Sequence, residues 1–137
     1  MIVGVRRWRA ITYWRSDCGV SDFKTLQVWQ KAHALSLSVD RACKGIRLPM
    51  YASLRNQLFR AAMSIAANIA EGSSQRTGKE FARFVRIALS SCSEVEHHLI
   101  VARDLKTIPA STFDSLVAQT ITVRKMLYGL HKMLSTP

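Results

Sequence analysis

Apolar residues recur at alternating steps of four and three positions between Phe81 and Ala102, and this repeat constrains the fold more than any other feature of the chain. Its members are Phe81, Val85, Ala88, Cys92, Val95, Leu99 and Ala102. Such spacing places every member on one side of an α-helix. The repeat therefore predicts a helix from about Thr77 to Leu105 that buries one face along its whole length, as helices do in bundles.

Three other segments share this periodicity. We expect a first helix from Ser21 or Asp22 to about Lys44, a second over residues 51–71, and a fourth after residue 109. Gly72 is expected to end the second helix in the left-handed conformation that glycine tolerates. No strand pattern competes. Four amphipathic helices with short connections predict an all-α fold, an antiparallel up-down-up-down four-helix bundle.

Residues 1–22 differ from the rest of the chain. They combine four arginines with two tryptophans, and they lack a sustained helical or alternating pattern. Arg9 and Arg15 interrupt any apolar stretch that a secretory signal would need. We expect this segment to be a poorly ordered basic and aromatic extension, and residues 23–137 to form the bundle as one domain.

The chain carries 20 lysines and arginines against 9 aspartates and glutamates, a formal net charge of +11. A positive field of this size attracts polyanions such as RNA and DNA. Helical spacing puts three cations on one face of the third helix, near the positive end of its dipole. The candidate phosphate-binding residues are Arg76, Lys79, Arg83 and Arg86, with Arg55 and Arg60 in addition. Phosphate contacts of this kind give affinity with little sequence specificity.

Two other interpretations of the charge stay open. The cationic face is an ordinary solvated surface, or it serves an acidic protein partner on a scaffold that binds no nucleic acid. The first two helices also carry more apolar positions than one core uses. These extra residues, Trp29, Leu37, Phe59 and Met63, are candidates for an interface between identical copies of the chain.

No pattern of catalytic residues stands out. Glu94 and His97 form a single Glu-x-x-His element, whereas a di-metal bundle needs two such elements and further carboxylates. Glu94 and His98 fit a simple pair one helical turn apart. Phosphate-binding loops, dinucleotide fingerprints and zinc-ligand spacings are missing from the sequence. We therefore expect neither an enzyme nor a bound metal or cofactor.

The cysteines and the hydropathy indicate the compartment. The chain has 3 cysteines at wide spacing, of which Cys43 and Cys92 occupy core positions. An odd number of separated cysteines suits free thiols in a reducing compartment. No apolar run is long enough to span a membrane. We expect a cytoplasmic protein without a membrane partner.

Several segments resemble a known family. They are Phe23–Ala32, Gln57–Gly72, Lys79–Phe84 and Ala88–Glu96, and the most specific part is Asn68-Ile69-Ala70-Glu71-Gly72. They are similar to the bacterial four-helix-bundle proteins encoded inside intervening sequences of 23S ribosomal RNA. That family is in turn similar to the accessory variability determinant of diversity-generating retroelements. The resemblance implies a basic homopentamer that engages nucleic acid and a reverse transcriptase.

Overall fold

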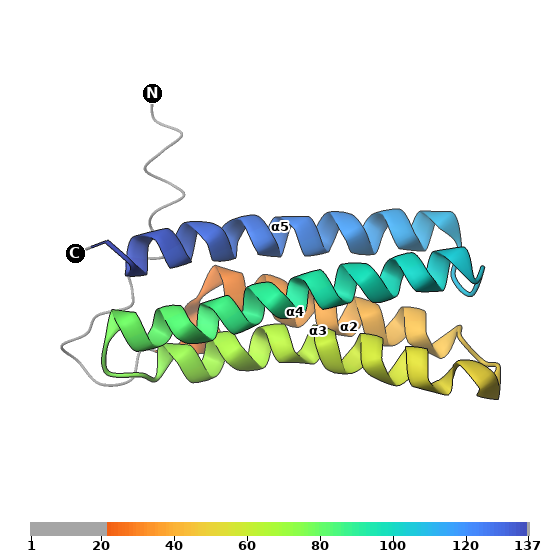
Figure 1. Ribbon diagram of the computed structural model, residues 1–137, viewed down its shortest axis with the longest axis horizontal. Coiled ribbons are helices and arrows are strands. Elements are labelled where there is room, and N and C mark those ends of the chain that lie inside the picture. The colour runs from red at the N-terminus through yellow and green to blue at the C-terminus, as the bar shows by residue number, and fades with distance from the viewer. Residues whose placement is uncertain (1–21, 137) are drawn as a thin grey trace, which may run out of the picture.

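The computed structural model describes residues 22–136, and these form a bundle of four antiparallel helices (Figure 1). No strand occurs in this part of the chain. The long helices are α2 (Gln27–Lys44), α3 (Ala52–Ser73), α4 (Gly78–Asp104) and α5 (Ala110–Leu134), and two 3-10 helices, η1 (Phe23–Thr25) and η2 (Pro49–Tyr51), precede α2 and α3. The predicted all-α, up-down-up-down bundle is confirmed. The predicted extension lies outside the described residues except for Asp22.

Each long helix packs against two neighbours. Contacts join α2 to α3, α3 to α4 and α4 to α5, and α2 also packs against α5 to close the ring. The bundle therefore has two distinct ends (Figure 1). We call the end that carries residues 74–77, between α3 and α4, the turn end. The other end carries residues 45–51 and 105–109, and we call it the loop end.

The predicted core repeat is confirmed. All seven members of the α4 repeat are fully buried, and so are Leu58, Ala62, Ile65 and Ile69 of α3. Cys43 and Cys92 are buried free thiols, as expected from their core positions. Burial raises the pKa of the Cys43 thiol to about 11, with a further contribution from the Asp40 carboxylate, and burial raises that of Cys92 to about 12.

Buried polar side chains fix how neighbouring helices align. The Ser36 hydroxyl donates to the Ala62 carbonyl oxygen at 3.1 Å, which ties α2 to α3. The hydroxyls of Ser64 and Ser91 lie 2.9 Å apart and tie α3 to α4. A slipped register would break both bonds between helices, at a net cost of about 0.5–1.5 kcal/mol each.

The first helix begins later than predicted. Asp22 caps η1 instead of α2, because its carboxylate accepts from the Lys24 backbone N–H at 3.1 Å. Leu26 then adopts an extended conformation and buries its side chain, and α2 starts at Gln27. The short side chain of Asp22 stabilises a local turn here, an alternative that such residues offer to a helix.

The prediction for Gly72 is wrong. Gly72 lies inside α3, which ends at Ser73, and no described glycine has a positive φ. A Cβ at this position would lie 2.5 Å from Cδ2 of Phe81 and 2.8 Å from Cβ of Phe84. Glycine is required because α3 and the start of α4 approach each other closely, and not because the backbone turns left-handed.

Among the described residues outside glycine, the left-handed conformation occurs at Lys106, with φ of 58°. Lys106 follows the end of α4, and the Thr107 N–H donates to the Ala102 carbonyl oxygen at 2.9 Å. This is the bonding of a Schellman motif, in which glycine is the usual residue. A lysine therefore stands where the conformation favours glycine.

Candidate nucleic-acid interface

Side-chain hydrogen bonds hold both helix ends that meet at the turn end. The Thr77 hydroxyl oxygen accepts from the Glu80 backbone N–H at 3.1 Å, with the spacing of a capping box. On the α3 side, the hydroxyls of Ser73 and Ser74 donate to the Ala70 and Glu71 carbonyl oxygens at 2.8 Å each. The backbone at the turn end is therefore held in a defined conformation. The four basic side chains described next begin at this turn.

Four cations extend from this turn along the outside of α4. Arg76, Lys79, Arg83 and Arg86 are all exposed. Helical geometry places Lys79, Arg83 and Arg86 within about 60° of one another around α4 and along about 10 Å of its length. We call these four residues the cationic stripe. The sequence prediction that Lys79, Arg83 and Arg86 share one face of the helix agrees with their exposed positions on α4, and Arg76 precedes the helix.

The cationic stripe is not neutralised by ion pairs within the described chain, although the exposed carboxylates of Glu71 and Glu80 stand at the same end. Its four members make no ion pair with a carboxylate of residues 22–136. Other acidic groups are engaged elsewhere: Asp40 with Lys44, Glu94 with His98, Asp104 with Arg103, and Glu96 with Arg124. The dipole of α4 adds positive potential at the same end. The stripe is open to an external anion.

The other two predicted cations do not join the stripe. Arg60 is exposed on the outer side of α3, and Arg55 is half-buried in the first turns of the same helix. Arg55 lies about 27 Å from the end of α3 at Ser73, given the helix rise per residue. Its Nη1 donates to the Ile46 carbonyl oxygen, so its side chain holds the α2–α3 connection.

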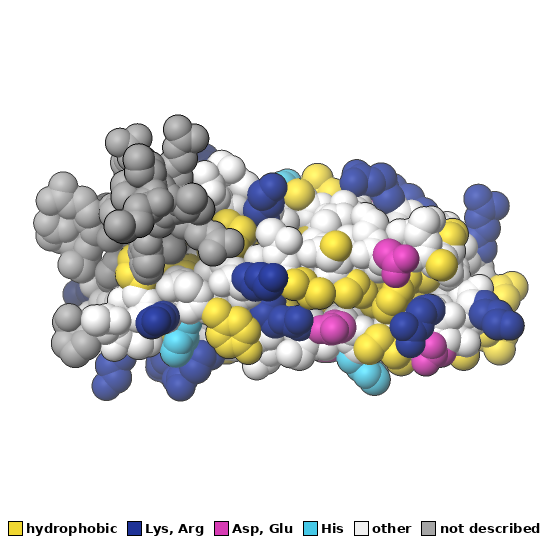
Figure 2. Space-filling view, turned by 90° about the horizontal axis from the view of Figure 1, so that it is seen from above, with side chains coloured by type: hydrophobic (Ala, Val, Ile, Leu, Met, Phe, Trp, Pro, Cys, Tyr) yellow, Lys and Arg dark blue, Asp and Glu magenta, His cyan; other side chains and the backbone are white. Residues whose placement is uncertain are grey.

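Basic side chains are not confined to the stripe. Figure 2 looks onto the α5 side of the bundle and shows Lys and Arg side chains along the length of that face, with acidic side chains at few places. Arg124 of α5 differs from the cations of the stripe because it has a carboxylate partner. It is paired with Glu96 of α4, and the hydrogen bond that its guanidinium donates to that carboxylate raises the pKa of Arg124.

The four predicted interface residues lie on neighbouring helices, and they divide into two kinds. Leu37 of α2 and Met63 of α3 are 48% and 42% exposed. Trp29 and Phe59 are partly buried and pack against the core. The Trp29 ring contacts Phe23 edge-on at 5.1 Å and stacks on His33 at 4.9 Å. The open part of this apolar surface is therefore centred on Leu37 and Met63.

The acid and imidazole cluster of α4 forms the simple pair predicted from its spacing. His98 is buried, and its Nε2 lies 3.5 Å from Oε1 of Glu94 without hydrogen-bond alignment. His97 stands beside it, with ring centroids 5.2 Å apart. Within residues 22–136, no three His, Cys, Asp or Glu side chains come together in a group that could hold a metal ion.

Sequence reasoning missed two parts of this surface. The first is the role of Gly72, which brings α3 against the start of the cationic stripe; no spacing rule separates such a glycine from a helix-ending one. The second is Ile87, which is 49% exposed one helical turn after Arg83. Its position outside the core repeat of α4 was the available signal.

None of the helices in the described residues is long and apolar enough to cross a membrane.

Comparisons with known proteins identify relatives of the chain. A family model described as "23S rRNA-intervening sequence protein" matches residues 24–129. Among solved structures, the bundle is similar to a protein of unknown function from the S23 ribosomal protein family of Bacteroides thetaiotaomicron, with a TM-score of 0.71 and 21% sequence identity. The match covers 80% of this chain and 99% of that one, and at this identity it shows the fold alone. No curated protein matches the sequence.

Proposed function

This chain belongs to the 23S rRNA-intervening sequence protein family, and we propose that it is a non-enzymatic, homo-oligomeric bundle that binds RNA or DNA through the cationic stripe. The observation that carries the proposal is the set of four exposed cations at the turn end, none of them paired with a described carboxylate. A polyanion supplies the missing negative charge. Because the stripe offers charge and few shaped contacts, it recognises phosphates rather than base sequence.

Salt dependence tests this mode of binding. Each phosphate neutralised by a cation contributes a slope of about −0.9 to log K against log salt for duplex DNA. The stripe spans about 10 Å, or about three base-pair steps of a duplex strand. We expect binding to structured RNA and to duplex DNA, with affinity that falls steeply between 50 and 200 mM salt and differs little between sequences.

Charge reversal locates the surface. The variant Arg83→Glu/Arg86→Glu should weaken binding to every probe alike, while helicity measured by circular dichroism stays unchanged. The matched control is Lys125→Glu/Lys132→Glu, which makes the same change in net charge at exposed positions on α5. Equal losses in the two variants would mean that net charge alone acts. Unchanged binding of the stripe variant would reject the proposed surface.

An acidic protein partner is the second candidate for the stripe. The observation that favours it is Ile87, an exposed apolar side chain one helical turn from Arg83. Protein interfaces typically combine a buried apolar contact with charged groups around it. Binding to nucleic acid distinguishes the two candidate functions. A scaffold for an acidic protein binds neither RNA nor duplex DNA near physiological salt, and its partner binding is sensitive to Ile87→Ser.

The oligomer rests on the apolar surface of α2 and α3. Leu37 and Met63 lie on adjacent helices, and a second copy of the chain would remove both from water. The family resemblance implies a homopentamer, a ring that head-to-tail contacts of one surface can close. We expect a mass above 15.4 kDa in light scattering, lowered by Leu37→Glu/Met63→Glu. Tyr128→Glu, at an exposed position on α5, should leave the mass unchanged; a monomeric wild-type protein would reject the oligomer.

A further inference from the structure

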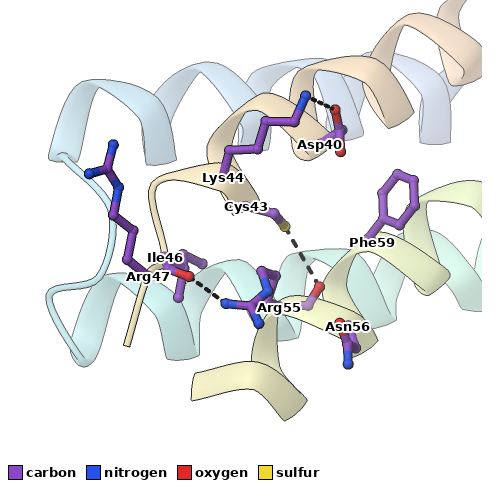
Figure 3. Close-up of a pocket in the computed structure, with 8 residues that line it drawn as sticks. All are labelled: Asp40, Cys43, Lys44, Ile46, Arg47, Arg55, Asn56 and Phe59. Carbon is purple, nitrogen blue, oxygen red and sulfur yellow. Dashed lines mark hydrogen bonds and ion pairs between the residues drawn. The ribbon is translucent and has the colours of Figure 1, made fainter. Parts of the chain in front are cut away.

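A second cationic feature lies at the loop end and is a cavity rather than a stripe. Its volume is about 420 Å³, and it opens between the last turns of α2, the 45–48 connection and the first turns of α3 (Figure 3). The lining residues are Asp40, Cys43, Lys44, Ile46, Arg47, Arg55, Asn56 and Phe59. The volume falls in the range of small-molecule sites, roughly 300–1,000 Å³.

The lining combines charge, an aromatic ring and an amide. Lys44, Arg47 and Arg55 supply three cations, and the one carboxylate in the lining, Asp40, lies 3.1 Å from Lys44 Nζ. Arg47 makes no ion pair with a carboxylate of residues 22–136. Positive charge therefore exceeds negative charge around the cavity. The ring of Phe59 and the exposed amide of Asn56 stand on α3, and Figure 3 shows Phe59 on the side of Asp40 and the Arg47 side chain on the opposite side.

One of the cations is already held in place. The Arg55 guanidinium donates to the Ile46 carbonyl oxygen, and the Arg55 carbonyl oxygen accepts from the Cys43 thiol at 3.6 Å. These two bonds join the last turn of α2 to the first turns of α3. Because they exist before any ligand arrives, the wall of the cavity loses little conformational freedom on binding.

We propose that this cavity binds a nucleotide, with the phosphate at Arg47 on one side and the base against Phe59 on the other. Arginine and lysine are the usual phosphate-binding side chains, and aromatic rings accept bases of any sequence by stacking. Asn56 can both donate to and accept from a base edge, and Asp40 can accept from a ribose hydroxyl.

The cavity binds and does not react. The Cys43 thiol in its lining is nucleophilic only when it is deprotonated, and its raised pKa of about 11 keeps it protonated near neutral pH. The nucleotide is either free or an unpaired residue of a nucleic-acid strand. The second case rests on the proposed function. In that case the cationic stripe binds phosphates of paired segments, and the cavity at the other end of the bundle binds an unpaired nucleotide.

Calorimetry with free ligands tests the cavity by itself. Adenosine 5′-monophosphate should bind more tightly than adenosine or inorganic phosphate alone. Arg47→Gln should weaken its binding at least fivefold, and so should Phe59→Leu, whereas the control Lys106→Gln at the same end should change it less than twofold. If Phe59→Leu fails to fold, Asn56→Ala at an exposed position takes its place. Monophosphate binding that is no tighter than that of phosphate, or that Arg47→Gln leaves unchanged, would overturn the proposal.

A strand probe tests the link to the proposed function. We would compare a hairpin that carries one bulged 2-aminopurine with a fully paired hairpin, following both affinity and fluorescence. Phe59 should quench the bulged base, and Arg47→Gln should remove at least a fivefold preference for the bulge. Arg83→Glu/Arg86→Glu should weaken both hairpins alike. If neither hairpin binds, the proposed function fails and the calorimetric result alone decides the cavity; if both bind equally and without quenching, the cavity is not used by strands.

Discussion

The two ends of the bundle use the same residue types in different ways. At the turn end, Arg83 and Arg86 stand on a regular helix, exposed and without a carboxylate partner in the described chain. At the loop end, Arg55 donates to a backbone carbonyl oxygen and Lys44 pairs with Asp40. The turn end therefore presents open charge, and the loop end presents charge that is partly committed to holding a connection.

This difference shows that a well-defined backbone at one end of the bundle does not imply that the cationic side chains there are held in place. The backbone at the turn end is closely defined by Gly72 and by the Thr77 cap, while its cations are unconstrained. The loop end contains the left-handed Lys106 and exposed apolar residues in its connection, while one of its cations, Arg55, is anchored to the backbone. A defined backbone with open charge suits contact with a regular polyanion. Anchored charge around a cavity suits a smaller ligand.

The largest expected effect concerns Gly72. Gly72→Ala forces a methyl group against Phe81 and Phe84 and should reduce the free energy of unfolding by about 1–3 kcal/mol. Gly129, inside α5, is the matched control because a Cβ there meets nothing within 4 Å. Gly129→Ala should raise the free energy of unfolding by about 0.5–1 kcal/mol through helix propensity. Urea denaturation at equal protein concentration measures both. Similar effects from the two substitutions would show that α3 and α4 do not approach closely at the turn end.

The next prediction concerns the salt dependence of duplex DNA binding, which should differ between variants of the two ends. Arg83→Gln/Arg86→Gln removes two phosphate contacts, so the slope of log K against log salt for duplex DNA should become shallower by about 1.8. At 0.1 M salt the affinity should fall by about 60-fold, which is 1.8 in log K for the one log unit between 0.1 and 1 M salt. The same neutralisation at the loop end, Arg41→Gln/Lys106→Gln, should leave the slope unchanged. Equal changes in slope from both pairs would mean that duplex DNA contacts the whole molecule.

Substitutions at the two ends of α4 should change the stability of the protein by smaller amounts and in opposite directions. Thr77→Ala removes the side-chain cap of α4 at the turn end and should cost about 1 kcal/mol, while Thr77→Ser should keep the cap and cost little. Lys106→Gly at the loop end should have the opposite sign. It relieves a left-handed lysine and should add about 1 kcal/mol. Thermal unfolding followed by circular dichroism measures each variant. Loss of stability in Lys106→Gly would contradict the strain inferred from its φ angle.

The sequence predicts those features that depend on one helix alone. The core repeat of α4 and the shared face of Lys79 and Arg83 follow from helical periodicity, and both are found. Features that depend on two elements were predicted less well. Whether Arg55 is open to a ligand depends on the Ile46 carbonyl oxygen across a chain reversal, and whether Trp29 is exposed depends on the ring of Phe23 before the helix. Gly72 was misread for the same reason, since its neighbours belong to α4.

The smallest effect is a pH dependence that originates in the buried thiols. The pKa of Cys43 is raised from 9.0 to about 11 in the folded protein, so the neutral thiol is the form that folding favours. The resulting contribution to stability is complete below pH 9 and declines as the pH rises from 9 toward 11. At pH 9.5 the expected loss from Cys43 is about 0.8 kcal/mol.

Cys92 lies in the α4 repeat, away from both ends, and its pKa of about 12 predicts the same loss at pH 9.5. The two thiols are distinguished at higher pH, because the contribution of Cys43 stops declining near pH 11 and that of Cys92 continues to fall. Urea denaturation of Cys43→Ala and Cys92→Ala between pH 7.5 and 11 measures this difference. If Cys43→Ala retains the full pH dependence of the wild type, the loop end is open enough for its thiol to ionise as in water, and the anchored wall of the cavity would have to be rejected with it.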